Sequence, residues 1–258
     1  MAKETVELIV QRSEWLSRHM VRVFLGGPGF ASFTPNRFTD AYVKLVFGTE
    51  DEPVLRTYTV RSIDEERQEI ALDFVVHGDD GIAGPWAAGV QAGEHVRLRG
   101  PGGAFRPDPD ADWYLLAGDE SAVPAIAAAL EALPESALGY AYIEVEADQD
   151  ELTLVAPRGV HVQWLHRGEP AASARPGPGG DGAPLVAAVR NAQWLAGTPH
   201  VFVHGEADTV MKGLRPYIRK ERGVPADRAS ISGYWRRGRT EEGFRVWKRE
   251  VAEAEKVG

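Results

Sequence analysis

The chain has 258 residues, of which 43% are hydrophobic and 26% charged, a composition typical of globular proteins and enough for one large or two smaller domains. Its 38 acidic and 29 basic residues give a formal net charge of -9, which disfavours binding to nucleic acid and to acidic membrane surfaces. The sequence contains no cysteine, which excludes disulfides, thiolate zinc sites, cysteine-ligated iron–sulfur clusters and cysteine nucleophiles, so any redox function needs an organic cofactor.

The first part of the chain, from Thr5 to about Leu98, is a series of short strands separated by Gly, Pro and Asp. This pattern of short strands and turns indicates an antiparallel barrel or sandwich. One short helix is predicted near Pro85 to Val90. The predicted strands are Val6–Val10, Met20–Leu25, Ala41–Phe47, Arg56–Val60, Glu69–Val76 and His95–Leu98.

The hydrophobic pattern changes after the Pro-rich stretch Phe105–Asp110. This stretch is predicted to be a linker between two domains, residues 1–108 and 112–258. Beyond it strands and helices alternate, which predicts an open parallel sheet with crossover helices. The Gly- and Pro-rich segment Ser173–Pro184 is predicted to be a mobile surface loop. The predicted elements are strands at Trp113–Ala117, Gly139–Val145 and Pro199–His204 and helices at Ala122–Leu133, Pro184–Ala196, Ala207–Glu221 and Thr240–Lys256.

The first candidate site is the strand segment Arg56–Arg61. Alternate side chains of a strand share a face, so Arg56, Tyr58 and Val60 point one way and the residues between them point the other. A flavin needs a flat apolar surface, hydrogen-bonding groups near its reactive nitrogen and a cation for its pyrophosphate, which Tyr58, Thr59 and one of the arginines could supply. The alternative is a core tyrosine between solvated arginines.

Two turns are candidates for binding anionic groups. His77–Ala87 is a Gly-rich turn that leads into the short predicted helix, where free backbone amides suit a pyrophosphate; an ordinary hairpin connection is the alternative. Gly118–Pro124 lacks both the three-glycine dinucleotide fingerprint and the phosphate-loop pattern. Asp119 or Ser121 could still cap a helix there and present amides to a nicotinamide dinucleotide, or could serve as a simple N-cap.

The segment Ser232–Arg239 places three arginines around two large aromatic residues, which suits a dinucleotide or an acidic chelate. The alternative is that Tyr234 and Trp235 only pin the last helix to the sheet. The seven histidines show no metal-ligand spacing, and no Gly-x-Ser-x-Gly motif is present, so neither a metal site nor a hydrolase is predicted.

Taken in order, these segments resemble the siderophore-interacting protein family, the flavin-dependent ferric-siderophore reductases of the ferredoxin-reductase-like group. The resemblance covers nearly the whole chain and implies a six-stranded FAD-binding barrel followed by a nicotinamide-binding α/β domain. The segments that carry it are Arg56–Arg61, Asp73–Gly78, Gly118–Ile126 and Ser230–Thr240.

The resemblance also assigns residues. It implies that Tyr58 lies against the flavin ring and Arg56 near the phosphates, whereas Gly81–Gly84 replaces the family's Gly-Pro-Ala-Ser and loses a serine hydroxyl. Lys44 matches a lysine placed near the bound chelate. The predicted cofactor-binding residues are Arg56, Tyr58, Thr59, Val60, Arg61, Asp73, Val75, His77, Gly81, Ala83, Gly84, Asp119, Glu120, Ser121, Tyr234, Trp235 and Arg236. The predicted substrate-binding residues are Lys44, Arg237 and Lys248.

The function implied by the resemblance is hydride transfer from NADH or NADPH to FAD, followed by single-electron reduction of iron(III) held in a siderophore. A flavin reductase, an electron-transfer module for a protein partner and a non-catalytic siderophore-binding protein remain alternatives. The nicotinamide preference stays open, because Glu144 and Glu146 could bind a ribose hydroxyl of NADH and the arginines at 236–239 could pair with the extra phosphate of NADPH.

The sequence predicts a cytoplasmic localisation. Residues 1–10 lack the basic start and apolar core of a signal peptide, and no apolar run approaches the roughly 18–20 residues that span a bilayer. We expect a monomer that binds a ferric siderophore and a nicotinamide dinucleotide, with no nucleic acid and no membrane insertion.

Overall fold

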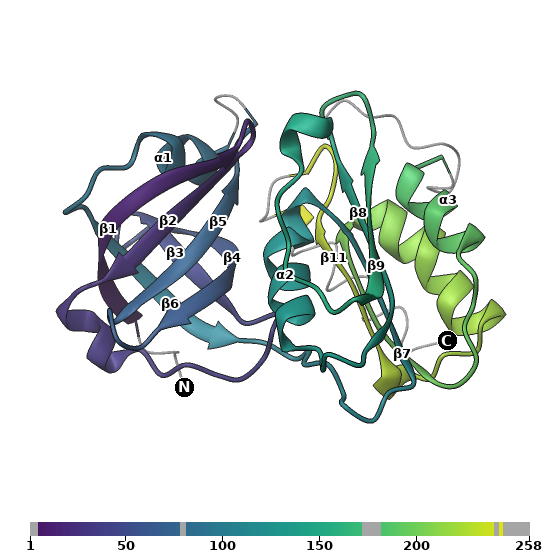
Figure 1. Cartoon of the computed structure of the whole chain (residues 1–258). Coiled ribbons are helices and arrows are strands. Elements are labelled where there is room, and N and C mark those ends of the chain that lie inside the picture. The colour runs from purple at the N-terminus through teal and green to yellow at the C-terminus, as the bar shows by residue number, and fades with distance from the viewer. Residues whose placement is uncertain (1–4, 78–80, 172–181, 240–242, 245–258) are drawn as a thin grey trace.

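The polypeptide folds into two parts that stand side by side, a barrel of strands and a sheet covered by helices (Figure 1). The computed structural model describes residues 5–77, 81–171, 182–239 and 243–244. An antiparallel six-stranded barrel followed by a parallel five-stranded sheet with helices confirms the predicted fold class. The predicted linker lies between the two sheets, and the domain limits 1–108 and 112–258 stay a prediction.

The barrel consists of β1 (Thr5–Ser17), β2 (Met20–Gly26), β3 (Tyr42–Gly48), β4 (Pro53–Asp64), β5 (Glu69–Val75) and β6 (His95–Gly102). They close in the order β1-β2-β5-β4-β3-β6, and every neighbouring pair is antiparallel. Exposed and buried residues alternate at the start of β1, which is the period of a strand that lines a core with one face. Val6, Leu8 and Val10 point inward there.

A short helix, α1 (Ala83–Gly89), covers part of the barrel and contacts β2 and β5. The predicted helix near Pro85 to Val90 is therefore present and begins two residues earlier. Its small residues Ala83 and Ala87 are buried against the barrel core. Trp86 packs edge-on against Phe74 and Phe47, with ring centroids 5.5 Å and 5.6 Å away.

The second part is built on β7 (Trp113–Asp119), β8 (Leu138–Val145), β9 (Gly159–His166), β10 (Pro199–Glu206) and β11 (Ala229–Trp235). All are parallel, in the order β11-β10-β7-β8-β9. The two central strands, β7 and β10, are buried along their whole length, as expected for a parallel sheet covered on both faces. The strand order reverses between β7 and β10, where the carboxyl ends of the two strands leave a topological switch point.

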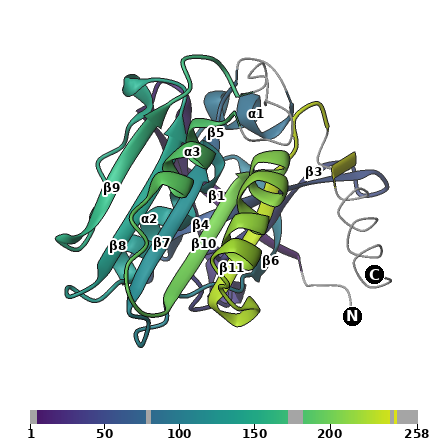
Figure 2. The same cartoon turned by 90° about the vertical axis from the view of Figure 1, so that its right-hand side faces the viewer.

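Helices cover both faces of the parallel sheet. The helix α2 (Val123–Ala132) lies between the sheet and the barrel, whereas α3 (Pro184–Asn191) and the π-helical segments η5 (Thr209–Leu214) and η6 (Tyr217–Glu221) cover the other face (Figures 1 and 2). Each face therefore has its own apolar core. None of the helices in the described part of the chain is long and apolar enough to cross a membrane.

Two strands of the parallel sheet were not predicted. Both β9 and β11 lie at edges of the sheet. β9 reads Gly-Val-His-Val-Gln-Trp-Leu-His, and β11 contains Ser230, Ser232 and Gly233, so neither offers the continuous apolar run of a central strand. Partly exposed edge strands carry a weaker hydrophobic signal for this reason.

Four other expectations differ from the structure or lie outside the described residues. The helix predicted over Pro184–Ala196 ends at Asn191, and the one predicted over Ala207–Glu221 consists largely of π-helical segments. The terminal helix predicted over Thr240–Lys256 lies outside the described residues apart from residues 243–244, and the predicted loop Ser173–Pro184 lies mostly outside them.

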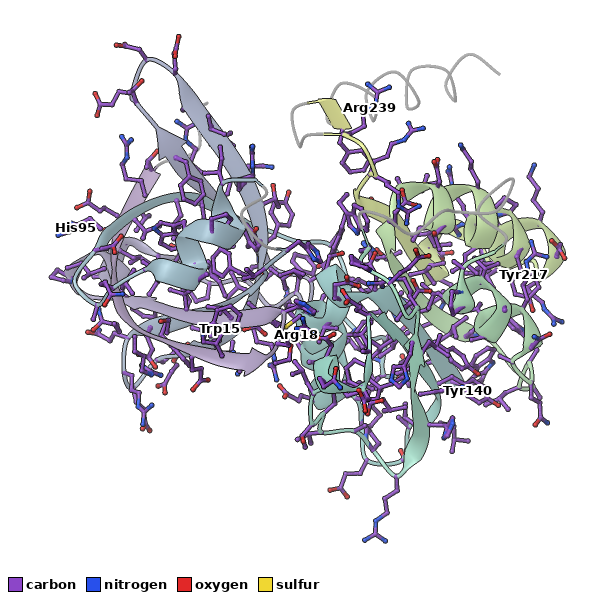
Figure 3. The ribbon with its side chains drawn as sticks, turned by 90° about the horizontal axis from the view of Figure 1, so that it is seen from above. Trp15, Arg18, His95, Tyr140, Tyr217 and Arg239 are labelled. Atoms are coloured by element: carbon purple, nitrogen blue, oxygen red, sulfur yellow. The ribbon has the colours of Figure 1, made fainter. Side chains whose placement is uncertain are left out.

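The two parts are joined by apolar and polar contacts. The end of the β1–β2 hairpin reaches the second part, where Met20 belongs to the core beneath α2 and Leu16 packs against it. Beside it the ring Nδ1 of His19 lies 3.0 Å from Asp150 Oδ1. Figure 3 shows Arg18 at this junction, whereas His95 lies at the far end of the barrel. The contacts fix the orientation of the barrel relative to the sheet.

We expect the Arg22→Ala variant to lose about 3–5 kcal/mol of unfolding free energy, because it leaves the Asp73 carboxylate buried without its cation. Arg22 donates to both oxygens of Asp73, at 2.6 Å and 2.8 Å, and the Asp73 side chain is 1% exposed. Chemical denaturation followed by circular dichroism measures the loss. Arg67→Ala is the control, since its ion pair with Asp64 is solvated and contributes about 0–1 kcal/mol. Equal losses in the two variants would contradict the prediction.

Candidate functional site

The β4 strand carries the first group of candidate residues. Arg56 and Tyr58 are half-buried and alternate with Thr57 and Thr59, and Val60 points into the barrel core. The ring of Tyr58 packs on Phe74 with centroids 4.2 Å apart. Tyr58 therefore combines a rigid aromatic backing with a side chain that remains partly accessible to a ligand.

Thr59 links the barrel to the last strand of the parallel sheet. It is 7% exposed, and its side chain interacts with the phenol of Tyr234 on β11. Burial is the main cause of the raised pKa of Tyr234, which keeps the phenol protonated. The Tyr234 ring also packs edge-on against His204 at 4.7 Å. Two predicted cofactor-binding residues from opposite parts of the chain thus meet.

Arg61 and Asp73 have protein partners in the structure. Arg61 donates to both oxygens of Glu131 on α2, at 3.0 Å and 2.5 Å, and Asp73 is paired with Arg22. These ion pairs hold the barrel to α2 and β2 to β5. The contact of Arg61 and Asp73 with a cofactor stays a prediction.

The predicted pyrophosphate turn borders the junction of the two parts. His77 is half-buried, and desolvation lowers its pKa, which keeps the ring neutral at pH 7. Gly81 has a φ of +83°, and a Cβ there would meet none of the described atoms within 4 Å, so this side of the turn is open toward the described residues. A Cβ on Gly84 would lie 3.1 Å from the Val75 oxygen. Residues 78–80 of the turn lie outside the described residues.

Asp119 lies at the switch point of the parallel sheet. Its Oδ1 accepts hydrogen bonds from the backbone and hydroxyl of Ser121, and its Oδ2 accepts from Glu206 N at 2.7 Å and Trp235 Nε1 at 2.8 Å. Burial, with the neighbouring Glu120, raises the pKa of Asp119 to about 7. Three of the predicted residues, Asp119, Ser121 and Trp235, therefore belong to one hydrogen-bonded unit.

Glu120 belongs to a second network at the same edge. Arg167, which follows β9, donates to both Glu120 oxygens at 2.8 Å and 2.7 Å and to Glu144 Oε1 at 3.3 Å. Glu144 Oε2 accepts from Leu185 N at the start of α3, at 2.9 Å. Burial raises the pKa of Glu144.

The predicted substrate residues do not lie together. Lys44 is on the outer face of β3 and donates to Thr57 Oγ1 at 2.8 Å. Arg237 lies beyond β11, where its Nε donates to Ala171 O at 2.9 Å, and the neighbouring Arg236 lies 3.7 Å from Asp208. Figure 3 shows Arg239 still farther along this segment. Lys248 lies outside the described residues.

The sequence alone did not identify Arg167 or Glu206 as site residues. Glu206 is the last residue of β10, a fully buried strand. A carboxylate at the carboxyl end of such a strand is a sequence signal that could have identified Glu206 as a site residue. Arg167 offers no comparable signal, because its partner Glu120 lies 47 residues away along the chain. Within the described residues, no group of three or more histidine or carboxylate side chains is placed to hold a metal ion.

Comparison with known families gives two matches along the chain. Residues 47–105 match the family described as a siderophore-interacting FAD-binding domain, and residues 111–238 match the siderophore-interacting protein family. The two matched segments contain the β4 strand and the whole carboxyl edge of the parallel sheet.

Three curated relatives match over most of their length. An uncharacterized protein of Mycobacterium tuberculosis is 56% identical, covering 93% of this chain and 93% of the relative. The ferric vibriobactin reductase of Vibrio cholerae is 32% identical, covering 95% and 94%. The NADPH-dependent ferric-chelate reductase of Escherichia coli is 32% identical, covering 89% and 92%.

Solved structures show the same architecture. A siderophore utilization protein from T. fusca superposes with a TM-score of 0.78 at 35% identity, covering 93% of this chain and 95% of that one. A ferredoxin NADP+ reductase from Neisseria gonorrhoeae with bound FAD and NADP superposes with a TM-score of 0.68 at 12% identity, covering 91% and 100%. The second likeness is one of fold alone.

We expect Asp119→Asn to destabilise the parallel-sheet part by about 1–3 kcal/mol, because the new amide group opposes N–H donors that now bind a carboxylate oxygen. Thermal and chemical unfolding curves measure the change. The exposed Asp148→Asn makes the same chemical change and should alter stability by less than about 0.5 kcal/mol. An Asp119→Asn variant as stable as this control would show that the four hydrogen bonds do not hold the edge together.

Proposed function

The chain belongs to the siderophore-interacting protein family, and from that membership we propose that it is a FAD-containing reductase that uses NADH or NADPH to reduce iron(III) in a ferric siderophore. The main structural support is the meeting of Thr59 on the barrel with Tyr234 of the parallel sheet, one residue along β4 from the Tyr58 ring that packs on Phe74. A ligand at this junction would touch residues of both parts.

The residues at the junction fit a flavin dinucleotide. Tyr58 supplies a flat, half-buried surface backed by Phe74, and Arg56 supplies a cation two residues away on the same face. At Gly81, a Cβ would meet none of the described atoms within 4 Å, so this side of the turn has space beside the barrel. Bound FAD would accept two electrons from the nicotinamide and release them singly, as iron(III) requires.

The side chains at the junction would position the flavin and set the charge around it. Phe74 packs against the Tyr58 ring, and Thr59 interacts with the phenol of Tyr234, so both side chains would be in place before a ligand binds. His77 is kept neutral by burial and would add no charge beside the cofactor. No general base is needed, because the reduction of iron(III) transfers only electrons.

The nicotinamide dinucleotide is proposed to bind at the carboxyl edge of the parallel sheet. Ligands of open α/β sheets bind outside the carboxyl ends of the strands at the switch point, which here lies between Asp119 on β7 and Glu206 on β10. Trp235 is fixed beside it by its hydrogen bond to Asp119. This edge continues through Tyr234 to the barrel.

The anionic chelate is proposed to bind near Lys44. In the pairing of β3 with β6, Lys44 lies directly opposite Arg99, and in the pairing with β4 it lies opposite Thr57. Like charges directly opposite in a sheet repel, so an anion between Lys44 and Arg99 would be stabilised by both. Arg236 and Arg237 lie beyond β11, at the other part of the molecule.

We expect purified protein to be yellow, and protein stripped of flavin to take up FAD. FAD at a hundredfold excess over its dissociation constant should add about 2.7 kcal/mol to the unfolding free energy. Tyr58→Ala should weaken FAD binding by roughly tenfold through loss of the aromatic surface. Trp15→Ala, which removes an exposed aromatic ring elsewhere in the barrel, should not. Protein that stays colourless with added FAD would rule the proposal out.

Lys44→Ala should weaken the capture of an anionic ferric chelate and leave FAD content and flavin reduction by nicotinamide unchanged. Anaerobic stopped-flow mixing of pre-reduced protein with the chelate measures the apparent affinity, which should fall by roughly tenfold with loss of the charge-assisted contact. Lys220→Ala, an equal charge change on an exposed residue of η6, is the control. Reduced protein that transfers electrons to no ferric chelate would instead favour a protein acceptor.

A further inference from the structure

A cavity of about 160 Å³ opens at the carboxyl edge of the parallel sheet. Its walls come from the ends of β7, β8, β10 and β11, from the start of α3 and from Arg167 after β9. An apolar cavity of about 150 Å³ is known to accept a benzene ring, so this one has room for a ring-sized group. It adjoins the switch point formed by Asp119 and Glu206.

Two arginines in this cavity retain unused donors. Arg167 Nε and Arg237 Nη1 are buried and have no hydrogen-bond partner among the described residues. The Arg167 side chain is only 5% exposed, so solvent does not readily replace a partner. Buried polar groups are nearly always satisfied, and exceptions of this kind point to a missing ligand or water.

Two carboxylates retain unused acceptor capacity. Glu144 accepts from Arg167 and Leu185 N, and Glu206 accepts from Arg237 N at 3.2 Å and Thr209 N at 2.9 Å. An ionised carboxylate can accept about four hydrogen bonds, so each has room for more. Asp119 already accepts four and has none to spare.

The charge of the cavity decides which ligand it suits. Four carboxylates line it, from Asp119, Glu144, Glu169 and Glu206, against the guanidinium groups of Arg167 and Arg237. The start of α3, where a phosphate would otherwise bind, already donates Leu185 N to Glu144. The cavity therefore suits hydroxyl groups, which can donate to the carboxylates and accept from the arginine donors, and its excess of carboxylates disfavours an additional dianionic phosphate.

We propose that this cavity binds the adenine ribose of the nicotinamide dinucleotide, with Glu144 accepting hydrogen bonds from its hydroxyls, and that it thereby selects NADH over NADPH. The inference rests on the proposed function, since it assumes a nicotinamide donor. A carboxylate that binds the 2′-hydroxyl and repels a 2′-phosphate is the general physical device for this choice. Glu146, the other carboxylate considered from the sequence, lines the crevice beside His77 instead.

The test uses FAD-loaded full-length protein and two probes that carry no nicotinamide, ADP-ribose and 2′-phospho-ADP-ribose. Calorimetric titration should show ADP-ribose binding roughly tenfold or more tightly, as expected for one unfavourable like-charge contact. Rates of flavin reduction should show the same preference for NADH over NADPH. Equal binding of the two probes, or tighter binding of the phosphorylated one, would overturn the inference.

The Glu144→Gln variant tests whether Glu144 causes the preference for ADP-ribose over 2′-phospho-ADP-ribose. Glutamine retains an oxygen that can accept from Leu185 N but removes the charge, so the preference for ADP-ribose should shrink by roughly tenfold. Glu135→Gln, at an exposed position after α2, makes the same change away from the cavity and should leave the preference intact. Circular dichroism and FAD content check folding. If Glu144→Gln does not fold, Glu206→Gln, which removes the second carboxylate, must reduce the preference, and an unchanged ratio overturns the inference.

The outcomes separate this inference from the proposed function. FAD-loaded protein that reduces no iron would contradict the proposed function, while the ADP-ribose titrations would still report on the cavity. Protein that reduces ferric chelates equally well with NADPH would leave the proposed function standing and overturn only the selection by Glu144.

Discussion

The Asp119 carboxylate is the interaction on which the carboxyl edge of the parallel sheet depends. It receives hydrogen bonds from three separate stretches of chain, at Ser121, Glu206 and Trp235, and so ties β7, β10 and β11 together where they end. The strands can approach this closely because Gly205 adopts a φ of +149° and a Cβ there would lie 2.7 Å from Asp119 Oδ2. A buried carboxylate with four donors is costly to disturb, and for that reason it orders the groups around it before any ligand binds.

The proposed path of electrons follows from how the two parts meet. The nicotinamide edge, built around Asp119 and Trp235, leads to Tyr234, and Tyr234 contacts Thr59 on the strand that carries Tyr58. Both proposed binding regions therefore share residues at the junction of the two parts. The ion pair of Arg61 with Glu131 braces this junction from the side of α2.

Sequence patterns predicted the strands whose apolar residues either alternate regularly or run continuously, and missed two strands whose polar residues interrupt both patterns. The barrel strands and the central strands β7 and β10 follow simple hydrophobic patterns, whereas the edge strands β9 and β11 carry polar residues and were overlooked. At the site, the spacing of Arg56 and Tyr58 indicated a shared face without knowledge of the fold. The partners of Arg61 and Asp73 could not be predicted, because ion pairs across 70 and 51 residues depend on the tertiary arrangement.

The hairpin formed by β1 and β2 has a consequence for how the molecule can be divided. Because Met20 and Leu16 complete the apolar core beneath α2, the parallel sheet cut off from the barrel would expose that core to water. The halves are thus poor candidates for exchange as autonomous modules. A chimera that joins the parallel-sheet part of a relative to this barrel would also need the relative's β1–β2 hairpin, or a redesigned apolar contact between the hairpin and the core beneath α2.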